Sequence, residues 1–346
     1  MIGVRQSDPA VLSELLDEEL ASDPTTSRQL TNHLPMALVA KAGLGADNEE
    51  LRRFTTRYAK RNVPLAPVQH HLDSSSWQSA VGQLGASGDL REYFVERVRD
   101  DGVAETVRTH LPALLPGIAG AAFHGVIRLA YALEVDSPPR VAAGLAYLAE
   151  MAAPLGPVRP GSATSDDPVE LIVTFATSQP WSREFKNENI GERMSAVAQG
   201  EAFQSLASSL ELNAESEHRL ADAALRIFAA TGDFTALHGV TGMSAISSIR
   251  TWSDDPALVD RYAFQALAAA YLTIGAPDLW SGDRLEQFVA SNETTPEETE
   301  RVGAYSDDEH VAKLIYTAHQ RWSRTRDPLY LAVAAREGGL MAPAGS

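Results

Sequence analysis

Cysteine is absent from the 346-residue sequence. The chain therefore has no disulfides, thiolate metal sites or iron–sulfur clusters, and no cysteine can act as a nucleophile. Any bound metal must be held by histidine, aspartate, glutamate or a modified side chain. Nitrogen and oxygen ligands of this kind suit non-haem iron, manganese or zinc.

Long apolar runs and basic residues are also scarce. No stretch approaches the roughly 18 consecutive apolar residues of a membrane span, and the N-terminal residues lack the apolar core of a secretion signal. The 29 basic residues are outnumbered by 46 acidic ones, which gives a formal charge of −17. That balance argues against nucleic acid and anionic membranes as partners. We expect a soluble cytoplasmic protein.

Several enzyme motifs are missing. There is no Gly-x-Gly-x-x-Gly between a strand and a helix, no Walker loop and no Gly-x-Ser-x-Gly elbow. The His-Glu-x-x-His motif and the pair of Glu-x-x-His motifs of di-iron bundles are absent as well. The sequence therefore gives no positive sign of a dinucleotide-binding fold or of a carboxylate-bridged di-iron site.

Apolar residues recur mostly at helical spacing, and alanine and leucine are abundant. Residues 61–86 predict a surface excursion, and Leu171–Ala176 is the one predicted strand. Because an isolated strand is marginal, the pattern predicts an all-α chain, a single domain of two helical layers. The expected helices cover residues 9–21, 26–43, 48–60, 88–113, 116–135, 139–153, 192–210, 214–230, 234–250, 257–274, 306–324 and 328–336.

The strongest break in this pattern is the Pro-, Gly- and Ser-rich segment 154–168. It would separate halves 1–153 and 169–346, each with one His-Gly-Val sequence, so a distant internal duplication is an alternative description of the domain. Glycine within a helix costs roughly 0.5–1 kcal/mol relative to alanine. Gly125 and Gly239, which follow the two histidines, therefore predict close approach by a neighbouring helix or a bound group.

Four of the nine histidines lie on otherwise apolar predicted helices, where a metal site and plain helix packing are the competing interpretations. These four are His33, His124, His238 and His310. The other five are expected elsewhere: His70 and His71 in a loop, His110 and His218 on the surface among polar neighbours, and His319 on the helix side opposite His310.

Two residues beside these histidines are expected to contact the ligands rather than a metal. Arg128 lies one helical turn after His124, where a buried guanidinium is costly unless it is paired, so it is expected either at the rim of the site or behind the ligands. Thr241 shares the helical stripe of His238.

Two of these histidines, His33 and His310, lie next to predicted helix starts. Pro35 either frees a carbonyl that orients His33, or begins a new helix that Asn32 caps. The segment Ser306–Glu309 predicts a capping box before His310. Lys313 then follows His310 by three residues, on the same side of the helix.

Five stretches of the sequence, taken in order, resemble the questin oxidase-like family. The resemblance extends from about residue 26 to about residue 336. It is carried by Asn32–Leu38 with Leu44–Ala46, Leu114–Gly117 running into Ala122–Arg128, Leu237–Gly242, Asp308–Lys313 and Asp327–Ala332.

Members of this family open rings of anthraquinone-type aromatic polyketides oxidatively, and some are mononuclear iron enzymes with four histidines and a carboxylated lysine. The resemblance therefore implies O2 and a quinone-type polyketide as substrates. It also implies Fe(II) as the cofactor, held by His33, His124, His238, His310 and a lysine. Lys313 is the first choice for that lysine, and Lys41, two helical turns after His33, is the alternative.

The implied chemistry is coherent, because a lysine in a dry pocket has a lowered pKa and offers a neutral amine to carbon dioxide. Gly125 and Gly239 would let the helices approach closely enough for their imidazoles to share one ion. Two other functions stay open: an NADPH-dependent Baeyer–Villiger-type oxidase without iron, and a non-catalytic helical binding protein. The aromatic residues that could stack on a flat substrate, or else belong to the core, are Phe123, Tyr131, Trp181, Phe234 and Trp252.

Overall fold

The computed structural model describes residues 7–159, 161–178 and 189–340. These residues form seventeen α-helices, and β1 and β2 pair as a two-stranded antiparallel sheet. The predicted all-α class is confirmed. By its internal contacts the chain divides into two compact units, Met1–Leu65 with Trp280–Ser346, and Ala66–Leu279.

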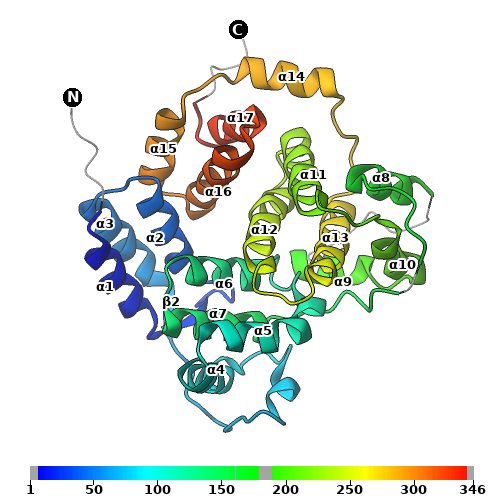
Figure 1. Cartoon of the computed structure of the whole chain (residues 1–346). Helices are drawn as coiled ribbons and strands as arrows, with labels where there is room; N and C mark the ends of the chain where they lie inside the picture. Colours follow the sequence, from blue (N-terminus) through cyan, green and yellow to red (C-terminus); the bar gives the residue numbers. More distant parts are fainter. Residues whose placement is uncertain (1–6, 160, 179–188, 341–346) are drawn as a thin grey trace. The chain divides into compact units, whose positions relative to one another are not determined.

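The first unit joins the two ends of the chain. Its core forms around α16, which packs against α2, α15 and α17 (Figure 1). Its elements are α1 (Pro9–Glu19), β1 (Ser22–Thr26), α2 (Leu34–Gly43), α3 (Asn48–Tyr58), η1 (Ala59–Arg61), β2 (Asn62–Pro64), α14 (Gly282–Ser291), α15 (Pro296–Tyr305), α16 (Glu309–Thr325) and α17 (Pro328–Glu337).

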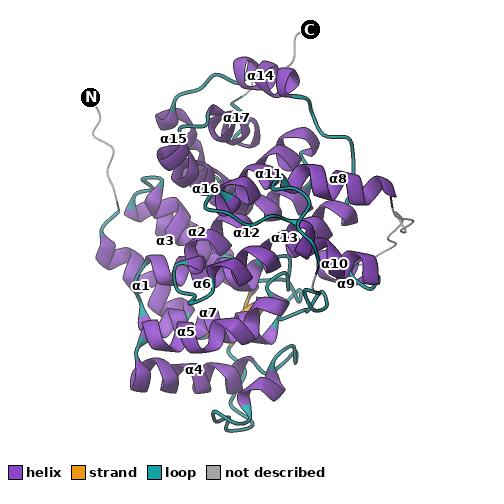
Figure 2. Cartoon of the chain, turned by 45° about the vertical axis from the view of Figure 1, so that its right-hand side comes forward, coloured by secondary structure: helices purple, strands orange, loops and turns teal. Residues whose placement is uncertain are grey.

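The regular elements formed by the described residues of the second unit are all helices. Helices α4, α5 and α7 lie side by side, α7 packs on α6, and α6 packs on α12 (Figure 2). Its elements are η2 (Trp77–Ala80), α4 (Ser87–Asp101), α5 (Val103–Leu114), η3 (Leu115–Gly117), α6 (His124–Glu134), α7 (Pro138–Glu150), α8 (Pro168–Ser178), α9 (Ile190–Val197), α10 (Glu201–Ser209), α11 (Ser216–Thr231), α12 (Phe234–Arg250) and α13 (Pro256–Thr273).

Helix starts that carry a cap or a proline agree best with the prediction. Asp233 caps α12 by accepting from the backbone N–H of Thr235, and α12 covers the predicted 234–250. Proline occupies the first turn of α1, α13 and α17, each within one residue of the predicted start. Residues 154–159 and 161–167 form no helix, as expected.

Several predicted elements are wrong. The helix expected over 88–113 breaks at Gly102, whose backbone has φ 82° and ψ 163°, so α4 and α5 are separate. The helix expected over 192–210 breaks between α9 and α10. Leu171–Ala176 lies inside α8 and not in a strand, because Asp167 accepts from the N–H of Val169 and starts a helix there. Helices α14 and α15 were not predicted.

The predicted helix 26–43 begins only at Leu34, after β1 and a turn. His33 is the residue before the first helical turn, and Oδ1 of Asn32 accepts from the backbone N–H of Leu34 at 3.1 Å. The interpretation in which a new helix begins near Pro35 is therefore the correct one. The proline costs no hydrogen bond, because it stands in the first turn.

None of the helices formed by the described residues combines the length and the apolar character that a membrane span requires. The cytoplasmic location and the single-domain description stay predictions. Both His-Gly-Val segments belong to the second unit, at the start of α6 and within α12.

Candidate metal centre

The first unit brings two of the four predicted histidines together. The ring centroids of His33 and His310 are 4.6 Å apart, and the rings are nearly perpendicular, at 86°. Each ring offers one nitrogen, and the two nitrogens lie within 4.8 Å of each other. His33 is buried before α2, while His310 is half-buried in the first turn of α16.

Carboxylates face the Nδ1 atoms of this pair. Oδ1 of Asp308 accepts from the backbone N–H of His310 at 2.7 Å and lies 3.3 Å from its Nδ1. Oε1 of Glu309 lies 3.5 Å from Nδ1 of His33. The contact with His310 lowers the pKa of Asp308 to about 2. The helix cap is therefore Asp308, and the expected capping box starting at Ser306 is wrong.

Three arginines hold the segment that carries His310. Arg53, Arg57 and Arg61 follow one another at four-residue steps along α3 and η1. Nη2 of Arg53 lies 2.8 Å from Oδ1 of Asp307, and Nη1 of Arg57 lies 2.6 Å from the same oxygen. Nη1 of Arg61 lies 2.9 Å from Glu309. The carboxylate that faces His33 is thus itself fixed by an ion pair.

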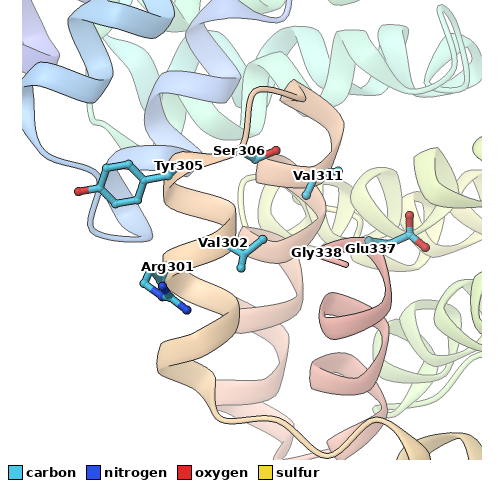
Figure 3. Close-up of a pocket in the computed structure, with 7 residues that line it drawn as sticks. All are labelled: Arg301, Val302, Tyr305, Ser306, Val311, Glu337 and Gly338. Atoms are coloured by element: carbon cyan, nitrogen blue, oxygen red, sulfur yellow. The ribbon is translucent and has the colours of Figure 1, made fainter. Parts of the chain in front are cut away.

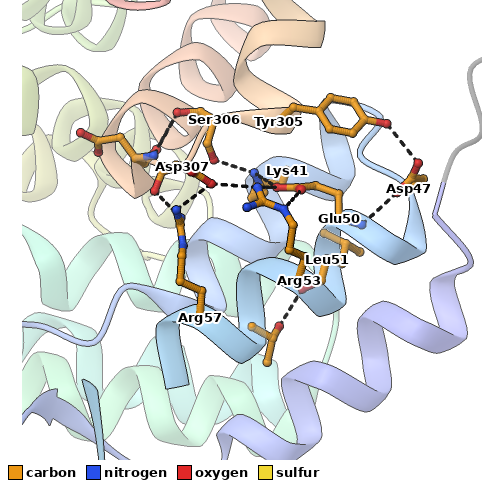
Figure 4. Close-up of polar contacts among 11 residues, drawn as sticks. Lys41, Asp47, Glu50, Leu51, Arg53, Arg57, Tyr305, Ser306 and Asp307 are labelled. Carbon is orange, nitrogen blue, oxygen red and sulfur yellow. Dashed lines mark hydrogen bonds and ion pairs between the residues drawn. The ribbon is translucent and has the colours of Figure 1, made fainter. Parts of the chain in front are cut away.

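Lys41, the alternative lysine of the first unit, forms a buried ion pair with Glu50 (Figure 4). Its Nζ lies 2.8 Å from Oε1 of Glu50 and donates to the carbonyl of Ser306 at 2.8 Å. Burial lowers the pKa of Lys41, and the neighbouring Glu50 opposes that shift. The amine therefore ties α2 to α3 and to the chain before α16, which is a structural role.

Lys313 has a different environment. Its side chain is buried on α16, and within the described part of the chain its Nζ makes no hydrogen bond or ion pair. Burial lowers the pKa of Lys313 to about 8, while the charges of Glu309 and Asp308 oppose the shift. A buried amine with a lowered pKa suits the reaction with carbon dioxide, so Lys313 fits the predicted role better than Lys41.

The second unit brings together the other two histidines. The ring centroids of His124 and His238 are 4.7 Å apart at 65°, and both side chains are buried. Nδ1 of His124 donates to the carbonyl of Ala121 at 2.5 Å, and Nδ1 of His238 donates to that of Phe234 at 2.7 Å. Because a carbonyl oxygen only accepts, Nδ1 carries a proton in both rings, and in the neutral imidazole Nε2 is then the nitrogen that keeps a lone pair.

The helix predicted over 116–135 begins only at His124. The three residues before it, Ala121, Ala122 and Phe123, have φ values of 48°, 54° and 66°. A left-handed residue with a Cβ costs roughly 1–2 kcal/mol. Three in succession form a strained turn, so residues 117–121 do not lie on one helix with His124.

The expectation that both glycines permit close packing is half right. A Cβ at Gly125 would lie 2.9 Å from Cα of Leu148 on α7, so this position needs glycine. A Cβ at Gly239 would meet only Cδ1 of Leu267, at an ordinary 3.8 Å. The crowded glycine of α12 is Gly242, where a Cβ would lie 2.6 Å from Cγ of Phe123.

Arg128 and Thr241 are both buried near the second pair. The guanidinium carbon of Arg128 lies 5.9 Å from the centre of the Tyr147 ring. The hydroxyl of Thr241 donates to the carbonyls of Leu237 and His238 at 3.4 Å, so its contact is with the backbone of its own helix. Their contact with the metal ligands stays a prediction.

The remaining histidines mostly lie where the sequence predicts. His70, His71 and His218 are exposed, the first two in a loop. His110 is buried, and its predicted exposure is wrong. Its Nδ1 donates to the carbonyl of Thr106 at 2.7 Å and its Nε2 accepts from the hydroxyl of Tyr93 at 2.8 Å. The polar neighbours in sequence lie on the other face of α5.

His319 is a buried histidine of α16 outside the pair. Its Nε2 lies 2.6 Å from the hydroxyl of Thr299, and its Nδ1 lies 3.3 Å from Glu300. Burial lowers the pKa of His319 to about 4, and burial also raises the pKa of Glu300, so the neutral imidazole is the folded form. The unfolded chain takes up a proton near pH 6.5, before the folded one does.

Acid should therefore destabilise the protein through His319, as pH falls from about 6.5 to about 4. The free energy of unfolding lost in this window is on the order of 3 kcal/mol. We expect His319→Gln to remove that part of the loss, measured by urea unfolding at a series of pH values. His218→Gln, at an exposed position, is the control, and its free energy of unfolding should depend on pH as that of the wild type does. Parallel curves for His319→Gln and wild type would contradict the prediction.

A pocket of about 570 Å³ opens between α15, α16 and the end of α17 (Figure 3). Its volume is within the range of small-molecule sites. The described residues that line it include none of the predicted metal ligands. They are Arg301, Val302, Tyr305, Ser306, Val311, Glu337 and Gly338.

Fold and side chains together define an all-α protein with two imidazole pairs, in which Nδ1 of His124, His238 and His310 each has an oxygen within hydrogen-bond distance. The questin oxidase-like family profile matches residues 30–318, most of the chain. The chain therefore belongs to the questin oxidase-like family, as its motifs predict. It is similar to a questin oxidase of Aspergillus terreus (strain NIH 2624 / FGSC A1156), with 25% identity over 130 residues. That match spans 34% of this chain and 29% of the relative.

Proposed function

We propose that this protein is a non-haem iron-dependent oxygenase that opens a ring of an anthraquinone-type polyketide by oxidative carbon–carbon cleavage. One observation carries the proposal: in three of the four predicted histidines, His124, His238 and His310, Nδ1 lies within hydrogen-bond distance of a carbonyl or carboxylate oxygen, and Oε1 of Glu309 lies 3.5 Å from Nδ1 of His33. Metal-binding histidines almost always donate their second ring N–H in this way.

The donor set suits iron. Four neutral imidazoles and one carboxylated lysine give five nitrogen and oxygen ligands, and an octahedral ion keeps one further position for a substrate. In this proposal the four histidines would hold one ion, as the resemblance of their motifs to the family implies. Iron(II), when bound, would supply the centre at which dioxygen becomes reactive.

The chain's own residues would prepare that centre. Asp308 would orient the ring of His310, Glu309 lies beside that of His33, and the burial of Lys313 would keep water from its amine once carboxylated. Phe234 is 54% exposed, and its ring centroid lies 4.6 Å from that of His238. An exposed aromatic ring beside a ligand is suited to stack on a flat quinone.

The test is a metal analysis of protein purified without chelator, together with oxygen uptake in the presence of an anthraquinone. We expect close to one iron per chain, and oxygen uptake that is lost on chelation and restored by iron(II). Zinc-loaded protein is the control. It should remain folded and take up no oxygen, because zinc has no redox chemistry.

Two results would contradict the proposal, and each would favour one of the alternative functions. Oxygen uptake that requires NADPH and survives iron removal would identify a Baeyer–Villiger-type oxidase without iron. A protein with no bound metal and with the same stability before and after chelation would be a helical binding protein, because a specifically bound ion stabilises the folded state.

A further inference from the structure

The left-handed turn before His124 needs support from outside itself. Three consecutive residues with a Cβ, Ala121, Ala122 and Phe123, have positive φ, and neither glycine nor asparagine relieves any of them. Such backbone persists only where surrounding contacts over-determine it. The turn is also next to a predicted metal ligand, which is where strained backbone tends to occur.

The support comes from helix α12. The side chain of Phe123 is completely buried, and its ring occupies the space that a side chain at Gly242 would fill. A Cβ at Gly242 would lie 2.6 Å from Cγ and 2.8 Å from both Cβ and Cδ1 of Phe123. Gly242 follows His238 by one helical turn, so the contact is on the helix side that carries this histidine.

The turn has a direct effect on His124. It brings the carbonyl of Ala121 back to the imidazole, where Nδ1 donates to it at 2.5 Å. The same carbonyl accepts from the backbone N–H of His124 at 3.2 Å. In a right-handed helix starting at residue 116, the His124 ring would have faced a different carbonyl.

We propose that Phe123 and Gly242 are positioning residues for the His124–His238 pair. Packing of the Phe123 ring on Gly242 keeps the left-handed turn in place, the turn presents the Ala121 carbonyl, and that carbonyl fixes the His124 ring at 4.7 Å from His238. The inference deepens the proposed function, since it assigns these two residues to the preparation of the metal site.

The test is cobalt(II) binding to metal-free protein, measured by calorimetry and by the visible absorption of the bound ion, which depends on ligand geometry. In Gly242→Ala the added methyl displaces Phe123, and we expect cobalt to bind about 10–100-fold more weakly, with an altered spectrum. The matched control is Gly239→Ala, the same substitution on the same helix, next to His238. Its methyl meets only Leu267 at 3.8 Å, so cobalt should bind within about twofold of wild type.

A second measurement needs no metal. In metal-free wild type the buried Nδ1–H of His124 should give a slowly exchanging imidazole proton signal by NMR, and Gly242→Ala should lose it while Gly239→Ala keeps it. Phe123→Ala removes the ring without adding a clash, and it should show the same two losses if Gly242→Ala fails to fold.

The outcomes separate the two proposals. Wild-type cobalt affinity and an intact Nδ1–H signal in folded Gly242→Ala, or equal losses in Gly239→Ala, overturn the positioning role. A wild-type protein that binds no cobalt overturns the proposed function. In that case the His124 Nδ1–H signals of wild type, Gly242→Ala and Gly239→Ala are the test of the positioning role.

Discussion

Replacing Lys313 by methionine is expected to abolish iron binding and, at the same time, to stabilise the metal-free protein. Lys313 is buried, and within the described residues its amine has no hydrogen bond or ion pair. A methionine fills nearly the same volume without a charge to desolvate. Burial lowers the pKa of Lys313 from its ordinary 10.5 to about 8, which corresponds to a cost of about 3 kcal/mol for keeping the charge buried, and methionine removes this cost. Opposite signs for stability and metal content are typical of a residue kept for function.

Lys41→Met is the matched substitution, and we expect the reverse result. It removes the partner of Glu50 at 2.8 Å and the donor to the Ser306 carbonyl. Breaking a buried ion pair costs about 3–5 kcal/mol. The lower end applies here, since Arg53 still contacts Glu50 at 2.6 Å. Iron content per folded chain should stay near that of wild type.

Urea unfolding of metal-free protein and metal analysis of folded protein measure both effects. Incubation with ¹³C-labelled bicarbonate adds a direct readout, because a carboxylated lysine gives a carbamate signal by NMR. The signal should be present in wild type and Lys41→Met and absent in Lys313→Met. A carbamate signal that disappears with Lys41 instead would assign the lysine ligand to α2.

His238→Ala is expected to lower metal affinity by more than about 100-fold. This exceeds the roughly 10–100-fold loss that follows from removing a residue that hydrogen-bonds to a metal ligand. Oxygen uptake should fall together with the metal content. The substitution suits the helix, since alanine has the highest helix propensity. It removes the ring that lies 4.7 Å from His124 and leaves its partner without a second imidazole. Metal content of purified protein and oxygen uptake per chain are the measurements.

The control for this prediction is His110→Ala. His110 is also buried and also donates from Nδ1 to a carbonyl four residues back, but its Nε2 accepts from Tyr93. Its replacement should lower stability and leave the metal content unchanged. A His238→Ala protein that keeps full iron content would remove His238 from the ligand set.

Local chemistry made much of the fold predictable. Where a cap or a first-turn proline marks a helix, as at Asp233 and Pro256, the start was found to the residue or nearly so. The errors arise where local preference and tertiary contacts disagree. Ala121, Ala122 and Phe123 are ordinary helix residues, and only contacts such as that of Phe123 with Gly242 explain their left-handed turn.

The residues of the candidate site could be predicted only in part, because several of their roles depend on long-range contacts. Spacing on α16 placed His310 and Lys313 on one side, but it could not distinguish Lys313 from Lys41, because an ion pair with Glu50 is a long-range contact. The polar residues before His110, Arg108 and Thr109, led to a wrong prediction of exposure, because the His110 ring faces the interior. Gly242 carried a signal, a second glycine three residues after Gly239, but only the Phe123 ring shows its purpose.

The division of the chain also sets an order for biosynthesis. Helix α2 leaves the ribosome early, yet its packing partners α15 and α16 are among the last helices made. The second unit, with both His124 and His238, lies entirely between them in sequence. Its histidine pair can therefore assemble during translation, whereas His33 has to wait for His310 until the chain is nearly finished.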